Sequence, residues 1–337
     1  MYNQGYVPDA SKIYTSVLNN YTNGVTVGLS NYTKGKKEWN KFYGYPEVGF
    51  LFHYEDLKNH EKLGSLFASA RFINFNLFNF YELDANLRTF FGLAYASKIF
   101  DPVENYKNPF FSKHINFFFG VDLNIEYPVS KHNNLYAFTG FSLFHVSNGE
   151  SRIPNKGMNN VNFNIGLSYR SIGKPEPDTK VKIRNRKIYF TVLPTIGIKE
   201  DWRYGSDKFT QLSISSEFLY QTGFKSIIGI GIDYFYDETL KSYSNHNLEP
   251  VKNNTDATYG GMCLTYQLNL YPLILVFKSG PQIINAKDSF GTLYNLYGFK
   301  YFFTPRLFAL MFHRSHGPLY GDNIEFGIGY SFKKSIE

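Results

Sequence analysis

The 337-residue sequence contains little cysteine and little tryptophan, and it lacks any long apolar run. Its one cysteine, Cys263, excludes an intrachain disulfide framework and a cysteine-based metal site. No stretch reaches the roughly 18 consecutive apolar residues that a membrane-spanning helix needs. Glycine-rich phosphate loops, EF-hand loops and zinc-ligand spacings are also absent, and the eight histidines are scattered. We therefore expect no metal and no cofactor.

Aromatic residues are frequent, at 19% of the chain, with 34 phenylalanines and 28 tyrosines. The mean hydropathy is nevertheless −0.31, so the chain is not hydrophobic on average. A closed membrane barrel has this combination, because only one strand residue in two faces lipid. A soluble β-sandwich or β-barrel also alternates and is the competing interpretation.

Alternating segments bounded by turn residues follow one another to the end of the chain, as in an all-β protein. Because a closed single-chain barrel takes an even number of strands, we expect about 12 to 16 strands, with about 14 as the best estimate, and few helices. The prediction is one antiparallel transmembrane β-barrel over residues 1–337, with an extended segment at 1–20 and a tail at 333–337. The predicted strands are 25–31, 46–54, 64–75, 87–97, 114–127, 134–146, 160–170, 188–199, 209–221, 224–236, 258–271, 273–284, 292–303, 306–313 and 323–332.

Two features favour a membrane barrel over a soluble one. Connections tend to alternate between short and long, as the two ends of an outer-membrane barrel require. The last strand ends in an aromatic residue, Phe332, which resembles the C-terminal signal of bacterial outer-membrane barrels. Segment 171–178, rich in proline and glycine, is interpreted as a linker between strands.

The net charge of +7 comes from lysines and arginines that lie mainly in predicted loops. Basic and aromatic residues together also occur in single-strand nucleic-acid binders. Here the aromatics follow the strand period, so a basic rim near anionic lipid headgroups, or simply solvated loops, explains the same pattern. We expect no nucleic-acid partner. The first residues do not form a signal peptide, and we expect an exported chain whose signal has been removed.

A polar, turn-rich loop at 145–160 separates two alternating runs near the middle of the chain. His145 and Ser147 lie two residues apart and therefore share one strand face, where a histidine base and a serine nucleophile could meet. That face also carries Phe141 and Leu143. If the apolar face contacts lipid, both polar side chains lie on the outside of the barrel, at its rim.

The hairpin resembles a known family. His145-x-Ser147-Asn148 followed by Pro154-Asn155-x-Gly157 is similar to the PagL-type lipid A 3-O-deacylases, which are outer-membrane β-barrel esterases. The likeness is greatest to larger relatives, often classed as acyloxyacyl hydrolases, in Bacteroidota. It covers roughly residues 40–170 and includes the segments 100–108 and 166–169, with a looser match at the C-terminal end.

The resemblance implies a role for each matching residue. Ser147 would be the nucleophile and His145 the general base, while Asn155 and a backbone N–H near Glu150 would form the oxyanion hole. Smaller members of the family orient the histidine with a carboxylate, and this chain has Asn159 at that position. Asn can orient imidazole but cannot stabilise imidazolium by charge, and Glu150 or Asp101 are alternative carboxylates. The supporting residues would be Asn148, Gly149, Pro154 and Gly157.

The expected function is therefore an outer-membrane esterase that removes an ester-linked acyl chain from lipid A, its partner in the outer leaflet. The alternatives are a non-catalytic barrel that serves as a structural or complex subunit, a narrow pore, and a soluble binding protein. A second His-x-Ser at 313–315 lacks a following Pro-Asn segment, so we do not expect a second active site there.

Overall fold

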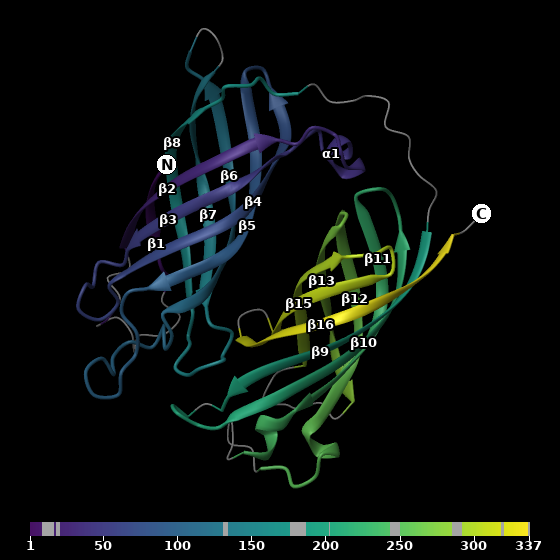
Figure 1. Ribbon diagram of the computed structural model, residues 1–337. Coiled ribbons are helices and arrows are strands. Elements are labelled where there is room, and N and C mark those ends of the chain that lie inside the picture. The colour runs from purple at the N-terminus through teal and green to yellow at the C-terminus, as the bar shows by residue number, and fades with distance from the viewer. Residues whose placement is uncertain are drawn as a thin grey trace. The chain divides into compact units, whose positions relative to one another are not determined.

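The computed structural model describes residues 1–8, 17, 21–130, 134–175, 187–201, 203–242, 250–284, 292–317 and 320–335. These residues contain sixteen strands, which close into two separate antiparallel barrels of eight strands each (Figure 1). The chain correspondingly divides into two compact units. The first comprises Met1–Asn148 and Pro154–Lys180, and the second comprises Gly149–Ile153 and Val181–Glu337.

The first barrel closes where β1 pairs with β8, and Tyr2 lies opposite Ile165 in that ladder. Its strands are β1 (Tyr2–Tyr6), β2 (Tyr21–Tyr32), β3 (Glu47–Asp56), β4 (Ser65–Phe80), β5 (Leu83–Ala96), β6 (Ile115–Pro128), β7 (Leu135–Ser147) and β8 (Met158–Tyr169). The described helices are short: α1 (Glu38–Phe42) and two 3₁₀ turns in the second unit, η2 (Glu238–Lys241) and η3 (Thr255–Ala257). None of these helices has the length and apolar character needed to cross a membrane.

The second barrel closes where β16 pairs with β9, and Phe326 lies opposite Ile196. Its strands are β9 (Lys187–Glu200), β10 (Lys208–Gln221), β11 (Ser226–Asp237), β12 (Thr258–Leu270), β13 (Leu273–Ile284), β14 (Leu293–Phe302), β15 (Leu307–His316) and β16 (Tyr320–Ser335). Each of the fifteen predicted strands overlaps one observed strand, from β2 to β16, so the all-β antiparallel class is confirmed.

The prediction of one barrel of about 14 strands was wrong. Alternation along a strand does not reveal which strand will close the sheet, so the sequence pattern could not separate two barrels from one. The predicted extended segment at 1–20 contains β1, and the predicted tail at 333–337 begins inside β16. Of the predicted linker at 171–178, residues 176–178 lie outside the described part of the chain.

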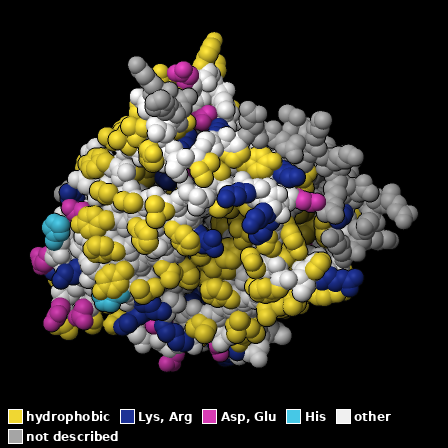
Figure 2. All heavy atoms as spheres, turned by 45° about the horizontal axis from the view of Figure 1, so that its top comes forward, with side chains coloured by type: hydrophobic (Ala, Val, Ile, Leu, Met, Phe, Trp, Pro, Cys, Tyr) yellow, Lys and Arg dark blue, Asp and Glu magenta, His cyan; other side chains and the backbone are white. Residues whose placement is uncertain are grey.

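The outer strand faces of both barrels are largely apolar, and their interiors hold many buried polar and charged side chains beside apolar ones. On β11, Ile228, Ile230 and Ile232 face outward and are about half exposed, whereas Asp233 is fully buried in the interior. Hydrophobic side chains cover much of the molecular face in Figure 2. An eight-stranded barrel is narrow enough for side chains to fill its interior, so polar side chains there have to satisfy one another.

Buried ion pairs lie in the interior of the second barrel. Lys278 contacts Asp233 at 2.5 Å and Glu217 at 3.4 Å, and Lys300 contacts the other Glu217 oxygen at 2.6 Å. Tyr294 donates its hydroxyl to Asp233 at 2.8 Å. Two cations thus balance two anions, and this pairing compensates the cost of removing four charges from water.

A second charged cluster lies in the same interior, centred on Asp322. Lys199 contacts both Asp322 and Asp237, and Arg314 donates to Asp322 at 2.8 Å and contacts Glu325 at 3.2 Å.

Replacing one cation of the first cluster tests how much the barrel depends on this pairing. Lys278→Met leaves Asp233 and Glu217 with one cation fewer in the interior, and we expect the unfolding free energy to fall by about 3–5 kcal/mol. Lys252→Met removes an exposed lysine instead and should change it by less than about 0.5 kcal/mol. Urea unfolding in detergent micelles measures both variants, and equal midpoints for them would contradict the expectation.

Candidate active site

The hairpin of β7 and β8 brings the predicted site residues to the outer face of the first barrel. His145 lies directly opposite Asn159 in the antiparallel ladder, and Ser147 is the last residue of β7. Phe141 and Leu143 precede them on the same face and are 61% and 48% exposed. His145 therefore faces outward at the end of an apolar strip, as the alternation predicted.

A hydrogen bond fixes the imidazole of His145. Its Nδ1 lies 2.7 Å from Oδ1 of Asn159. Because an amide oxygen only accepts, Nδ1 carries the proton, and Nε2 is left as the basic nitrogen. The Phe119 ring, the cross-strand neighbour on β6, lies 5.1 Å from the imidazole and limits its rotation.

Gly157 lies where His145 and Ser147 converge. A β-carbon at this position would lie 3.2 Å from Nε2 of His145 and 3.1 Å from Cβ of Ser147. Both side chains therefore approach the same point, and the position has φ +63°, which favours glycine. Within the described residues, His145 and Ser147 do not share a hydrogen bond.

The predicted oxyanion residues follow Ser147 in the loop. Oδ1 of Asn155 accepts from the backbone N–H of Asn148 at 3.0 Å, so the Asn155 side chain is anchored through its oxygen and keeps its NH₂ group for another acceptor. Glu150 has φ +57°, and its carbonyl accepts from the Glu200 amide at 3.1 Å. The Glu150 N–H as an oxyanion donor stays a prediction.

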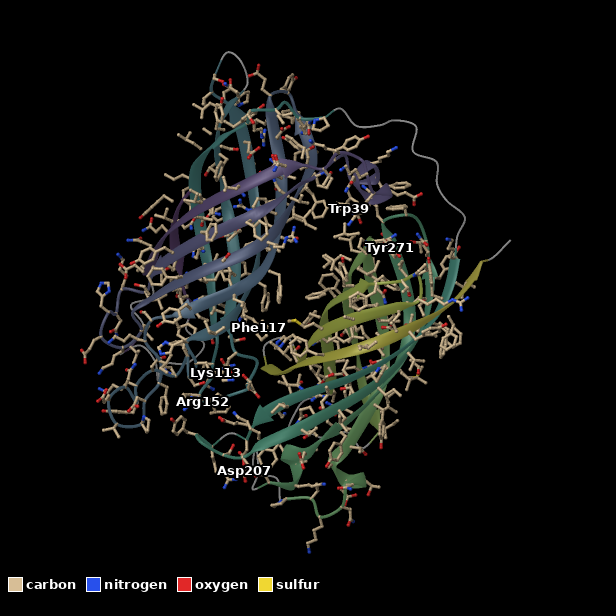
Figure 3. All side chains as sticks on the ribbon, viewed as in Figure 1. Trp39, Lys113, Phe117, Arg152, Asp207 and Tyr271 are labelled. Carbon is tan, nitrogen blue, oxygen red and sulfur yellow. The ribbon has the colours of Figure 1, made fainter. Side chains whose placement is uncertain are left out.

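Two buried asparagines tie the neighbouring loops together. Nδ2 of Asn105 donates to the carbonyls of Lys62 and Ile99, and Nδ2 of Asn108 donates to those of Lys62 and Lys98, all within 3.1 Å. Three strand ends are thereby joined at one rim of the barrel: those of β3, β4 and β5. Phe117 and Lys113, labelled in Figure 3, lie near the start of β6 in the same region.

The loop that begins at Asn108 also supports the residue after the serine. Ser112 accepts from Nδ2 of Asn148 at 3.0 Å, and the Lys156 amide donates to the Pro109 carbonyl at 3.0 Å. Ser112 and Asn148 are both buried. Ser112 was not predicted, because nothing in the spacing of a single serine marks it as a partner of a distant loop.

Asp101 does not serve as the carboxylate partner of His145 in this structure. Its Oδ1 accepts from the amides of Glu104 and Val103, each at 2.8 Å, and these amides lower the pKa of the carboxyl group. It therefore caps its own turn. No group of three or more His, Cys, Asp or Glu side chains in the described ranges is placed to hold a metal ion.

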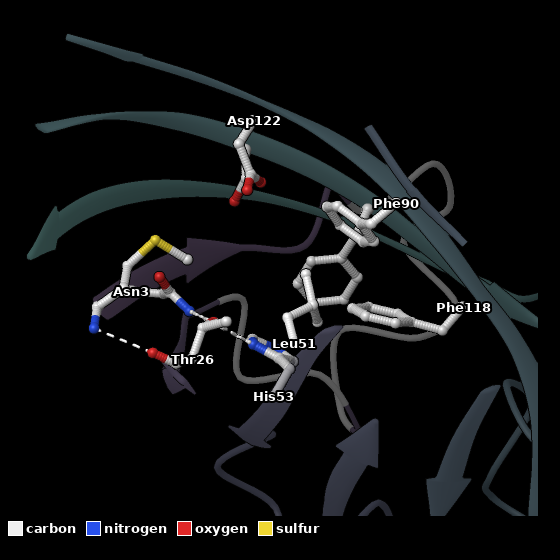
Figure 4. A pocket seen from close by; sticks show the side chains of 10 residues that line it. Asn3, Thr26, Leu51, His53, Phe90, Phe118 and Asp122 are labelled. Atoms are coloured by element: carbon white, nitrogen blue, oxygen red, sulfur yellow. Dashed lines mark hydrogen bonds between the residues drawn. The ribbon is translucent and has the colours of Figure 1, made fainter. Parts of the chain in front are cut away.

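A hydroxyl–imidazole–carboxylate chain lies inside the first barrel, beside a small cavity (Figure 4). Nδ1 of His53 lies 2.8 Å from the Thr26 hydroxyl, and Nε2 lies 3.0 Å from Glu55. Asn3 also donates to the Thr26 hydroxyl, and Asn160 donates to Glu55. The Thr26 hydroxyl and the Glu55 carboxylate are thus already bound by these amides. We therefore interpret the Thr26–His53–Glu55 arrangement as part of the polar packing of the interior.

Asn108 offers a test of the loop support that is independent of activity. Asn108→Ala removes two donated bonds and the Oδ1 acceptor of the Phe110 and Phe111 amides in a fully buried position, so we expect a loss of roughly 2–3 kcal/mol of local stability. Amide hydrogen exchange at Phe110 and Phe111 should accelerate. Asn253→Ala, at an exposed position, is the control, and unchanged exchange in Asn108→Ala would contradict the assigned support.

Comparisons with known proteins cover both barrels. Residues 24–168 match the family model described as lipid A 3-O-deacylase (PagL), and residues 187–334 match the model described as acyloxyacyl hydrolase, C-terminal domain. No curated protein matches the chain.

Solved structures show only distant likeness. CdiB from Acinetobacter baumannii has 11% identity, with 99% of this chain and 59% of that chain covered and a TM-score of 0.20. An outer-membrane channel from Pseudomonas putida F1 has 10% identity, with 99% and 93% covered and a TM-score of 0.19. TM-scores of this size do not establish a common fold. The two family models do identify the chain: it belongs to the PagL-type lipid A 3-O-deacylase and acyloxyacyl hydrolase family of outer-membrane β-barrels.

Proposed function

We propose that the first barrel is an esterase that removes an ester-linked acyl chain from lipid A, with both barrels embedded in the bacterial outer membrane. The observation that carries the proposal is the His145–Asn159 hydrogen bond on the outer face of the β7–β8 hairpin, with the buried Ser147 two residues further along β7 and beside the same glycine. A lipid substrate reaches such a site from the bilayer without entering the barrel.

Ser147 and His145 divide the chemistry between them. The Ser147 hydroxyl attacks the ester carbonyl while Nε2 of His145 takes its proton, and a tetrahedral oxyanion forms. The NH₂ group of Asn155 and the backbone N–H of Glu150 donate to that oxyanion. The intermediate expels the sugar alkoxide, which takes the proton back from His145, and leaves an acyl-enzyme. Water, deprotonated by His145, then releases the fatty acid and restores Ser147.

The Ser147 hydroxyl has to turn toward His145 before it reacts, because the two share no hydrogen bond in the structure. Such bonds are often long in empty sites and tighten when substrate binds. Nε2 of His145 and Cβ of Ser147 each lie within 3.2 Å of the same point beside Gly157, which supports such a movement.

The outer surfaces of both barrels support a lipid environment. Large apolar residues remain about half exposed along the strands, although exposed apolar patches of this extent are rare on soluble proteins. Lipid-facing apolar residues alternating with polar interior ones are the pattern of outer-membrane barrels.

A structural or complex-forming barrel without catalysis is the second candidate. The missing Ser147–His145 hydrogen bond and the neutral Asn159 in place of a carboxylate favour it. A pore is less compatible with the structure, because ion pairs fill the second interior and the Arg88–Asp122 pair and packed phenylalanines occupy the first.

The nucleophile is tested with purified protein and lipopolysaccharide in detergent. The wild-type chain should release a 3-hydroxy fatty acid, and Ser147→Ala should lower that rate at least 1,000-fold, on the order of the loss seen for other serine nucleophiles. Ser168→Ala, on the next strand, is the matched control and should leave the rate unchanged. Release that persists in Ser147→Ala would exclude Ser147 as nucleophile, and no release by the wild type in any detergent would favour the non-catalytic candidate.

Asn159→Asp tests the role of the neutral orienting residue. A carboxylate beside Nδ1 stabilises the protonated imidazole, so the acidic limb of the pH–rate profile should move to higher pH by roughly 1 unit or more. The plateau rate should rise as well, because imidazolium forms in the transition state. Asn159→Leu removes the hydrogen bond and should lower the plateau. An identical profile for all three proteins would show that position 159 does not act through His145.

A further inference from the structure

The segment Gly149–Ile153 lies in the chain between Ser147 and Asn155, but it belongs to the second compact unit. It interrupts the connection between β7 and β8, whose other residues belong to the first unit. The segment carries Glu150, whose backbone N–H is one of the two proposed oxyanion donors. The contacts that hold this segment therefore bear on the position of that donor.

Glu200, the last residue of β9, binds the backbone of this segment at two points. Its amide donates to the Glu150 carbonyl at 3.1 Å, and Oε2 of its carboxylate accepts from the Ile153 amide at 2.7 Å. The two bonds hold the segment near its start and at its end. Glu200 is only 6% exposed, so water competes little for its carboxylate.

Lys208 lies opposite Glu200 in the β9–β10 ladder and contributes a third bond to the segment. Its ammonium group donates both to the Ser151 carbonyl and to Oε1 of Glu200. The carboxylate thus accepts from a backbone N–H of the segment, the ammonium donates to a backbone carbonyl, and the two charges neutralise each other. Hydrogen bonds assisted by charge in this way are shorter and stronger than those between neutral groups.

Gly149 and Arg152 add contacts with β16 and with the β9–β10 connection. A β-carbon on Gly149 would lie 2.6 Å from Cγ1 and Cδ1 of Ile324, so the backbone packs directly on that side chain. Arg152 donates to the Tyr204 hydroxyl at 3.2 Å, and its guanidinium lies 5.7 Å from the centre of that ring. Glu150 has φ +57°, and a non-glycine residue keeps such a backbone only where its surroundings hold it.

We propose that Glu200, together with Lys208, is a positioning residue for the proposed ester hydrolysis. It fixes the segment that carries the Glu150 N–H, so that this donor is in place before the oxyanion develops. Oxyanion donors act through such preorganisation, and an error of about 1 Å in the placement of a group can lower a rate about 100-fold. The inference rests on the proposed function, and it assigns a residue of the second barrel to that reaction.

Steady-state hydrolysis of lipopolysaccharide by the full-length protein tests this role. Glu200→Ala should lower kcat about 10- to 100-fold and leave KM within about twofold of the wild type, because an oxyanion donor acts in the transition state. Glu200→Gln keeps an oxygen for the Ile153 amide and should restore kcat to within about fivefold of the wild type. An unchanged kcat in Glu200→Ala, or a Glu200→Gln variant no faster than Glu200→Ala, would overturn the inference.

Glu238→Ala is the matched control. Oε2 of Glu238 accepts from the Thr210 amide at 2.7 Å, so this variant removes a carboxylate-to-backbone bond of the same length elsewhere in the same barrel. It should leave kcat and KM unchanged. An equal fall of kcat in Glu238→Ala would attribute the loss to general destabilisation of the barrel and would count against the role of Glu200.

Lys208→Met serves if Glu200→Ala does not fold, because the Lys208 side chain is about half exposed. It removes the bond to the Ser151 carbonyl and should also lower kcat while KM stays constant. The wild-type kcat in this variant would decide against the inference.

Amide hydrogen exchange at Ile153 separates this inference from the proposed function. Exchange should accelerate in Glu200→Ala and stay unchanged in Glu238→Ala, because only the first variant removes the acceptor of that amide. Unchanged exchange in Glu200→Ala would show that Glu200 does not hold the segment, whether or not the protein is active. If the wild type releases no fatty acid, the proposed function fails, and the exchange result alone decides whether Glu200 fixes the segment.

Discussion

The narrow interior of an eight-stranded barrel determines how both halves of this chain are packed. Side chains have to fill such an interior, and each polar group there needs a partner. The second barrel meets this requirement with balanced ion pairs, such as Lys300–Glu217. The first meets it with asparagine hydrogen bonds, such as Asn160 to Glu55, and with the Arg88–Asp122 pair, and aromatic rings such as Phe118 and Phe144 pack beside them. Interiors filled in this way favour the outer face and the rims as the place for the proposed chemistry.

The proposed site is consistent with this preference. A hairpin provides two neighbouring strands whose outward residues face the same surroundings, so His145 and Asn159 meet across one ladder position. The loop after Ser147 is held by a hydrogen bond that the Asn148 side chain donates to Ser112 of a neighbouring loop. The strand ladder thus positions His145, the proposed base, and the loop contacts position the residues that follow Ser147.

Alternation predicted the strands well because it is a property of each strand alone. It also placed His145 on the outer face, since parity needs only the local pattern. It failed for β1, whose five residues Tyr2–Tyr6 contain glycine and no apolar run, and it failed for the number of barrels. The presence of β1 and the number of barrels both depend on which distant strands pair. The hydrogen bonds from Asn105 and Asn108 to the Lys62 carbonyl join residues more than 40 positions apart, and no local spacing predicts such contacts.

The neutral hydrogen bond between His145 and Asn159 has a consequence for where this chemistry is possible. A histidine paired with a carboxylate brings a full negative charge to the barrel surface, and an unshielded ion is costly next to hydrocarbon. Here imidazole, amide and hydroxyl carry no formal charge at rest. No ion therefore has to lose its water where the imidazole and the amide meet the apolar strand face, so the proposed site is compatible with a greater depth in the leaflet. In the proposed reaction, charge separation would arise only for the duration of each bond-breaking step.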